Sequence, residues 1–213
     1  MNIKQAQQLT FMSTLDRMLA KTMAEIIKEK IDEKTRQNLE IRLQARYGTN
    51  IIEAIEDFHK FDATLREFFG PKADALEKDF LAQLISLDTS KKGITWIIIK
   101  NQDLSKLILE SYGDRDKRLI LDSALKTPGP ILDILESCKI PKSSGYRIIN
   151  ELTEDGLLIE EGYTTSEGKN VVTYTALFEN VTIDIEKSGI VVKVLVKENI
   201  FRESFLVKIL LEL

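Results

Sequence analysis

Hydroxyl, amide, phenol and guanidinium side chains are concentrated between residues 142 and 155. The small and apolar residues of this stretch recur at steps i, i+3, i+4 and i+7, the spacing of one helix face. They are Gly145, Ile148, Ile149 and Leu152. The opposite face carries Ser143, Arg147, Asn150 and Glu154, flanked by Ser144 and Tyr146. Hydroxyls and amides bond base edges or phosphates, and an arginine can donate two hydrogen bonds to guanine. The spacing therefore predicts a helix whose polar face can enter a DNA major groove.

A second polar stretch follows this helix after a short apolar strand over residues 157–160. Residues 163–170 form a polar tip, and residues 171–177 are rich in the β-branched and aromatic side chains that favour strands. The pattern predicts a β-hairpin, with a wing over residues 163–172 that can touch phosphates or the minor groove. The predicted DNA-binding residues are Lys142, Ser143, Ser144, Tyr146, Arg147, Asn150, Lys169 and Asn170.

The helix predicted just before residue 142 provides the surface on which the polar helix packs. Its apolar residues are Ile131, Leu132, Ile134, Leu135 and Cys138. The sequence Pro-Gly-Pro at 128–130 isolates its start, and Pro141 restarts the chain after the turn. Gly156 can end the second helix in a left-handed conformation. These signals predict a helix-turn-helix followed by a hairpin.

Residues 140–158, IPKSSGYRIINELTEDGLL, resemble archaeal winged helix-turn-helix regulators related to the arsenical-resistance repressor family. Those regulators typically show a Ser/Thr pair, then Tyr-Arg, then Leu, then Gly-Leu-Leu or Gly-Leu-Ile. The resemblance covers residues 114–178, and it implies DNA contacts for Ser143, Ser144, Tyr146 and Arg147. Metal-sensing members use clusters of Cys and His. This chain has one of each, Cys138 and His59, far apart in sequence, so metal sensing is not implied.

Residues 1–90 are predicted to form an all-helical domain that senses, dimerises or recruits. Its first helix, over residues 3–31, has an apolar stripe of Leu9, Met12, Leu15, Leu19, Met23, Ile26 and Ile27. Such a long helix either packs within its own domain or pairs with a second copy. Asp32 is expected to cap the next helix and Gly48 to end it, and Asn50 with Glu53 predicts a capping box. Pro71 starts the last helix of this domain.

This half also resembles an archaeal helical domain, called an output domain, that is found beside signalling modules. The resemblance is carried by Arg46-Tyr47-Gly48, Glu53-Ala54, Asp57-Phe58 and residues 65–70. Phe58, Phe61, Phe68 and Phe69 are interpreted as core rather than as a ligand box. If an unidentified small-molecule or protein effector binds, we expect it on this domain. His59 has no orienting partner nearby, and Glu56, Asp57 and Asp62 are interpreted as a solvated face and a helix cap.

The remaining chain is divided into a winged helix-turn-helix domain over residues 91–180 and a docking or dimerisation segment over 181–213. The polar residues 87–93 are predicted to be a linker, followed by a strand over 94–100. Alternation over residues 181–197 predicts a hairpin buried on one face, which can share a sheet with that strand. A single helix over residues 199–213 would dock on its own domain or on a partner subunit, since regulators of the resembled group dimerise through terminal helices.

Composition narrows the function classes. The net charge of −4, from 30 basic and 34 acidic residues, excludes a strongly basic DNA-coating protein but not a local binding face. Residues 91–156 carry 11 basic and 10 acidic side chains, and the flanking thirds are negative. A single Cys and the absence of a signal or spanning segment predict a cytoplasmic protein. We find no phosphate-cradling glycine loop, catalytic carboxylate pair or ligand cluster, so no enzyme, cofactor or metal is expected.

The sequence thus predicts a mainly helical α+β fold: an all-helical domain, then a winged helix-turn-helix domain with an extra hairpin and a C-terminal helix. The leading hypothesis is a DNA-binding transcriptional regulator that acts as a homodimer on double-stranded DNA. Its two recognition helices would lie ~34 Å apart, one DNA turn. The alternative is a protein-protein interaction scaffold that uses the same fold without sequence-specific DNA binding.

Overall fold

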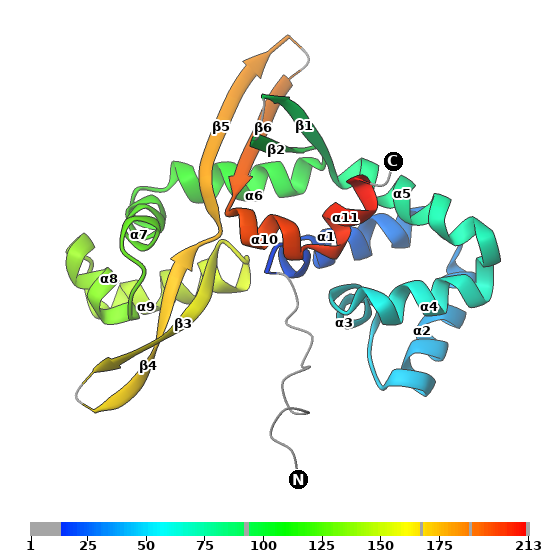
Figure 1. The fold of residues 1–213 in the computed structure, drawn as a ribbon, viewed down its shortest axis with the longest axis horizontal. Helices are drawn as coiled ribbons and strands as arrows, with labels where there is room; N and C mark the ends of the chain where they lie inside the picture. The colour runs from blue at the N-terminus through cyan, green and yellow to red at the C-terminus, as the bar shows by residue number, and fades with distance from the viewer. Residues whose placement is uncertain (1–13, 92–93, 167, 188, 212–213) are drawn as a thin grey trace.

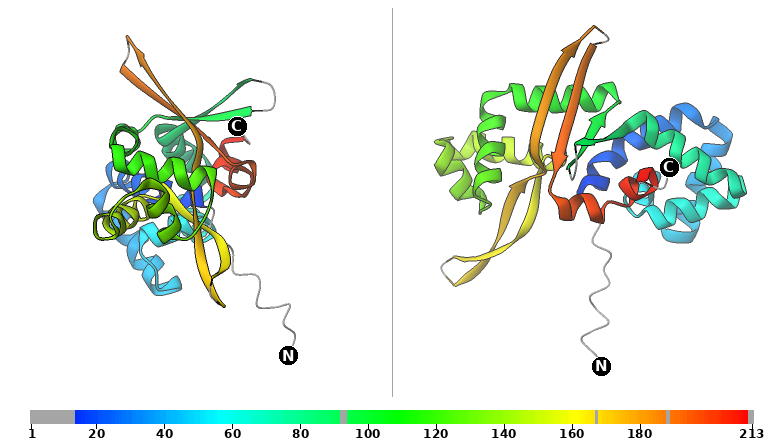
Figure 2. Two further views of the ribbon diagram at one scale, coloured as in Figure 1. Left: turned by 90° about the vertical axis from the view of Figure 1, so that its left-hand side faces the viewer. Right: turned by 45° about the horizontal axis from the view of Figure 1, so that its top comes forward.

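The computed structural model describes residues 14–91, 94–166, 168–187 and 189–211, which form a mixed α and β protein (Figure 1). Helices α1 to α5 lie on one side, and α7 to α9 with the β3–β4 hairpin lie on the other (Figures 1 and 2). A four-stranded sheet and α6 connect the two groups. None of the helices formed by these residues is long and apolar enough to span a bilayer.

The N-terminal helices follow their predicted capping signals at α2 and α3, whereas Pro71 lies in a short 3-10 helix and α5 begins at Ala73. They are α1 (Thr14–Lys30), α2 (Glu33–Tyr47), α3 (Ile51–Glu56), α4 (Phe58–Phe69), the short 3-10 helix η2 (Gly70–Lys72) and α5 (Ala73–Leu84). The Asp32 carboxylate accepts a hydrogen bond from the Thr35 amide at 3.0 Å, and Gly48 ends α2 with a φ of 67°. The capping box of Asn50 and Glu53 is present. The predicted 3–31 helix is confirmed from residue 14, and its first residues lie outside the described part of the chain.

The sheet is antiparallel, with strand order β1-β2-β6-β5. Its strands are β1 (Ile85–Lys91), β2 (Ile94–Ile99), β5 (Phe178–Glu186) and β6 (Gly189–Val196). The predicted sharing of one sheet by these distant segments is confirmed. The predicted linker over 87–93 is wrong as far as residue 91, because Ile85 and Leu87 alternate with polar residues and pair with Ile99 and Ile97 of β2.

The far end of the β5–β6 hairpin projects beyond the helices (Figure 1). Near its base Val192 and Val194 are fully buried, as the predicted one-sided burial requires. Ile183, which lies opposite Val192, is 44% exposed, and Ile185 and Ile190 at the projecting end are 86% and 56% exposed. The prediction of a hairpin buried along one whole face is therefore wrong at this end, where the strands outrun the layer beneath them.

The predicted helix-turn-helix and hairpin occupy the middle of the chain. The elements are α6 (Gln102–Gly113), α7 (Arg115–Lys126), α8 (Ile131–Cys138), α9 (Lys142–Glu154), β3 (Leu158–Ser166) and β4 (Lys169–Ala176). Asp114 caps α7 through the Lys117 amide, and Gly156 adopts a φ of 73° after α9. Most of the predicted polar tip over 163–170 is paired strand instead, with Tyr163 opposite Val172 and Ser166 opposite Lys169.

The C-terminal segment forms two helices, α10 (Glu198–Glu203) and α11 (Phe205–Leu211), rather than the single helix predicted. The chain breaks at Ser204, which is fully buried. Helix α10 packs on α1, and α11 packs on α5. The ring centroids of Phe58 and Phe205 lie 5.0 Å apart. The tail therefore docks on the N-terminal helices of its own chain, and buried apolar residues from α1 to α11 form one connected core.

Candidate nucleic-acid interface

Helix α9 is pressed against α8 by a tight turn and a glycine. Lys139 takes a left-handed conformation, and the Ile140 amide donates to the Leu135 carbonyl at 3.0 Å. Gly145 lies so close to α8 that an added Cβ would come within 2.5 Å of Leu135 Cδ2. The absence of a side chain at Gly145 therefore sets the distance between the two helices.

The predicted division of α9 into an apolar and a polar face is confirmed. Gly145, Ile148, Ile149 and Leu152 are buried. On the other side, the exposed residues are Lys142, Ser143, Tyr146, Arg147 and Asn150. Ser144 is half-buried, and its hydroxyl donates to the Pro141 carbonyl at 3.1 Å. The polar groups thus face solvent along the first two and a half turns of the helix.

The N-terminus of α9 has no side-chain cap. Pro141 precedes the helix, and the first backbone hydrogen bond into it runs from the Gly145 amide to the Pro141 carbonyl at 2.8 Å. The backbone amides of a first helical turn have no carbonyl partner within the helix. Such amides and the helix dipole favour an anionic ligand at this end.

Arg147 is held by a carboxylate on its own helix. Glu151, one turn further on, pairs with Arg147 through one oxygen and with Lys117 of α7 through the other, at 3.1 Å. The hydrogen bond from Lys117, ahead of the charge of Arg147, lowers the pKa of Glu151 below its usual value. Sequence reasoning missed Glu151, although its i+4 spacing from Arg147 is a known pairing signal.

The far end of α9 is fixed to the N-terminal helices. Lys21 Nζ of α1 donates to the Glu154 carbonyl at 3.2 Å. A Cβ on Gly156 would meet Met18 Cβ at 3.0 Å, so the turn after α9 also touches α1. Helix α9 is therefore anchored at its C-terminus, while its N-terminal half is left uncovered by the described residues.

The β3–β4 hairpin extends from the same end of the molecule as α8 and α9 (Figure 1). Its base is tied to the α7–α8 connection, because Gly129 and Tyr174 exchange backbone hydrogen bonds of 3.1 and 2.8 Å. Lys169 and Asn170 are exposed near its tip, opposite Ser166 and Thr165. Tyr163, which sequence reasoning did not select, is 73% exposed on the same hairpin.

A carboxylate cluster lies elsewhere, between α4 and α5. Carboxylate oxygens of Asp62, Asp74 and Glu77 lie within 4.8 Å of one another, which could suit a metal ion. The Arg66 guanidinium already pairs with both aspartates. Glu77 is 3% exposed, and its Oε1 has no hydrogen-bond partner among the described residues. Burial, followed by the charge of Asp62, raises the pKa of Glu77 to about 8. The sequence was interpreted as placing Asp62 on a solvated face, but its side chain is half-buried.

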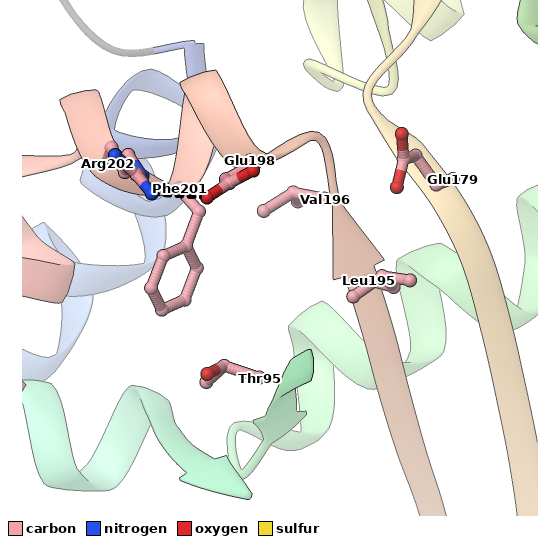
Figure 3. A pocket seen from close by; sticks show the side chains of 7 residues that line it. All are labelled: Thr95, Glu179, Leu195, Val196, Glu198, Phe201 and Arg202. Atoms are coloured by element: carbon pink, nitrogen blue, oxygen red, sulfur yellow. Dashed lines mark hydrogen bonds and ion pairs between the residues drawn. The ribbon is translucent and has the colours of Figure 1, made fainter. Parts of the chain in front are cut away.

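A cavity of about 410 Å³ lies where β2, β5 and β6 meet α10 (Figure 3). Its lining is Thr95, Glu179, Leu195, Val196, Glu198, Phe201 and Arg202. Arg202 is paired with Glu198 at the rim, and the Phe201 ring points into the space (Figure 3). None of the predicted site residues lies here.

His59 and Cys138, the residue types here that could suggest a catalytic role, both make structural contacts. The His59 ring packs edge-on against Phe205, with centroids 4.9 Å apart. The Cys138 thiol donates to the Leu119 carbonyl at 3.2 Å. Phe58 and Phe61 are buried, as predicted for core residues, whereas Phe68 is 38% exposed.

Comparison of the chain with protein-family models, with curated proteins and with solved structures finds no match.

Proposed function

We propose that this protein is a DNA-binding transcriptional regulator of the winged helix-turn-helix type, related to the archaeal regulators that its sequence resembles. The observation that carries the proposal is the polar N-terminal half of α9, which no described residue covers. Helices α7, α8 and α9, followed by a hairpin tied to Gly129, support this assignment.

In this proposal the polar face of α9 enters the major groove. Arg147 and Asn150 would read base edges, and Ser143 and Tyr146 would contact bases or backbone. The pairing of Arg147 with Glu151 keeps the guanidinium extended along the helix surface before DNA arrives. Binding would exchange the carboxylate for guanine or phosphate oxygens.

The uncapped start of α9 and the tip of the β3–β4 hairpin would hold the DNA backbone. First-turn amides can bond one phosphate, and Lys169 and Asn170 can reach a second or the minor groove. The chain carries a net charge of −4, so few phosphates would be neutralised and the salt dependence of binding would be shallow.

We further propose that the protein is a cytoplasmic homodimer. Its N-terminal helices would bind a small-molecule or protein effector. No catalytic step is assigned to it. A protein-interaction scaffold is the second candidate, favoured by the low positive charge of the α7–α9 region.

The test begins with selection of bound duplexes from a random-sequence pool by the full chain, followed by fluorescence anisotropy on the enriched sequence. Arg147→Ala should weaken specific binding by about 1–3 kcal/mol. Arg202→Ala is a matched control, because Arg202 is equally exposed and pairs with a glutamate four residues away, on α10. Failure to enrich any duplex, with no binding at low salt, would reject DNA binding and favour the scaffold.

A further inference from the structure

The projecting end of the β5–β6 hairpin combines exposed apolar side chains with an unpaired strand edge. Ile183 and Ile185 of β5 and Ile190 of β6 share one face, since Ile185 lies opposite Ile190 and Ile183 opposite Val192. Among the described residues, β5 pairs with β6 alone, so its other side is an edge of the sheet. Edge strands of this kind are templates for pairing with another chain.

We propose that a second copy of the chain docks on this edge, with the two β5 strands antiparallel about Ile183. The two four-stranded sheets then join into one. A two-fold axis at Ile183 places residues whose side chains point to the same face of the sheet opposite each other, as an antiparallel ladder requires. The facing pairs are Val181 with Ile185, Thr182 with Asp184, and Asn180 with Glu186; beyond this ladder, Glu179 at the β5 bulge comes opposite Lys187 in the turn.

Charge complementarity favours this register. Every acidic residue of β5 faces an uncharged or basic residue, and the Glu179–Lys187 pair occurs twice, once on each side of the axis. Shifting the axis to Asp184 would set two Asp184 carboxylates opposite each other. An axis at Ile185 would set Asp184 opposite Glu186 on both sides. Like charges directly opposite destabilise a strand pair.

The apolar pattern supports the same arrangement. With the axis at Ile183, Ile183 meets its own copy, and Val181 meets Ile185 on the same face. Directly opposite side chains in a ladder lie about 4.5–5.5 Å apart, within contact distance. Ile185, which is 86% exposed in the single chain, thereby gains an apolar neighbour.

The other candidate surfaces fit a second copy less well. The opposite edge of the sheet is β1, whose outer half is the polar run Asp88–Lys91. The C-terminal helices are already packed on α1 and α5. The β5–β6 end also projects away from the β3–β4 hairpin (Figures 1 and 2), so pairing there leaves α9 uncovered. A dimer formed on this edge specifies the interface of the proposed homodimer and is independent of DNA binding.

The first experiment is sedimentation velocity on the full chain across the micromolar range. The wild type should be a dimer. Lys187→Glu should raise the dimer dissociation constant roughly tenfold, because two attractive pairs become repulsive. The double variant with Lys187→Glu and Glu179→Lys should dimerise with wild-type affinity, because the two opposite charges have then exchanged places. Circular dichroism spectra identical to the wild type establish that these exposed substitutions leave the fold intact.

The second experiment uses the position of the axis. A cysteine introduced by Ile183→Cys, in a Cys138→Ser background, would face its own copy at a separation that a disulfide can bridge. Mild oxidation should cross-link it into a dimer. Thr165→Cys, exposed on the β3–β4 hairpin, is the matched control and should not cross-link.

A monomeric wild type over this concentration range would overturn the proposal. So would a dimer that Lys187→Glu does not weaken, or cross-linking equal at positions 183 and 165. These outcomes are distinct from a loss of DNA binding, because the proposed DNA-binding helix α9 lies away from the β5–β6 end.

Discussion

The Asp16 carboxylate in α1 accepts a hydrogen bond from the hydroxyl of Ser204, 188 residues later in the chain. Its second oxygen accepts from the Phe205 amide at 2.8 Å, and the Ser204 hydroxyl oxygen accepts from the Val207 amide at 3.1 Å. Asp16 and Ser204 together cap α11, and this joins the two ends of the described chain. The cap is buried, so its loss would leave donors without partners.

Asp16→Ala should lower the free energy of unfolding by about 1–3 kcal/mol, the cost of leaving a buried polar group unsatisfied. Urea denaturation followed by circular dichroism measures this. Asp116→Ala is the control, because Asp116 is also acidic and in a first helical turn, but is exposed on α7. Equal midpoints for the two variants would mean that Asp16 does not hold the tail.

Gly145→Ala should destabilise the protein, although alanine normally favours a helix over glycine. The added methyl would overlap Leu135, whose side chain is itself buried, and overpacking of this kind costs about 1–3 kcal/mol. Gly113→Ala, at the end of α6 with open space around it, should be neutral or stabilising. Thermal unfolding of the two variants compares them directly. A Gly145→Ala variant as stable as the wild type would show that α8 and α9 can separate without cost.

Glu151→Gln tests the electrostatics of the proposed DNA interface. It removes a negative charge beside Arg147 and Lys117, so both cations become available to phosphates. Affinity for duplex DNA should rise at low salt, with a steeper dependence on salt concentration, because each freed cation displaces about one counterion. Anisotropy titrations at several salt concentrations give both quantities. Glu198→Gln, which frees Arg202 on α10, is the control and should leave both unchanged. Weaker binding by Glu151→Gln would contradict the assignment of Arg147 to DNA.

The elements that the sequence predicted correctly depend on local signals. The polar and apolar faces of α9 follow from a 3.6-residue period, and Asp32 and Asn50 are caps that act within three residues. The period of two over residues 190–196 was sufficient to predict β6. These features need no knowledge of distant contacts.

The errors arise where a distant partner decides the structure. Residues 88–91 are polar, so the stretch from residue 87 looks like a linker, but pairing with β2 makes it a strand. The break at Ser204 depends on Asp16, and no local residue breaks the helical pattern there. Burial of Glu77 depends on the packing of α5 against α4 and α1. At the candidate interface the exposed residues followed from the helix period, whereas the bond from Lys117 to Glu151 required the placement of α7.

Glu77 predicts a pH dependence of stability. Its carboxyl has an ordinary pKa near 4.5 when unfolded and about 8 when folded, so the native state holds the proton more tightly. The stabilisation is complete below about pH 4.5 and is lost as the pH rises towards 8. Glu77→Gln keeps a neutral side chain at every pH. Relative to the wild type it should therefore become more stable as the pH rises from 5 to 8, by at most about 1.4 kcal/mol per pH unit. Urea denaturation of both proteins across this range measures the difference, with Glu29→Gln on the exposed face of α1 as control. Parallel pH profiles for wild type and Glu77→Gln would show that folding does not raise the pKa of Glu77, and that the carboxylate is ionised beside Arg66 in the folded protein.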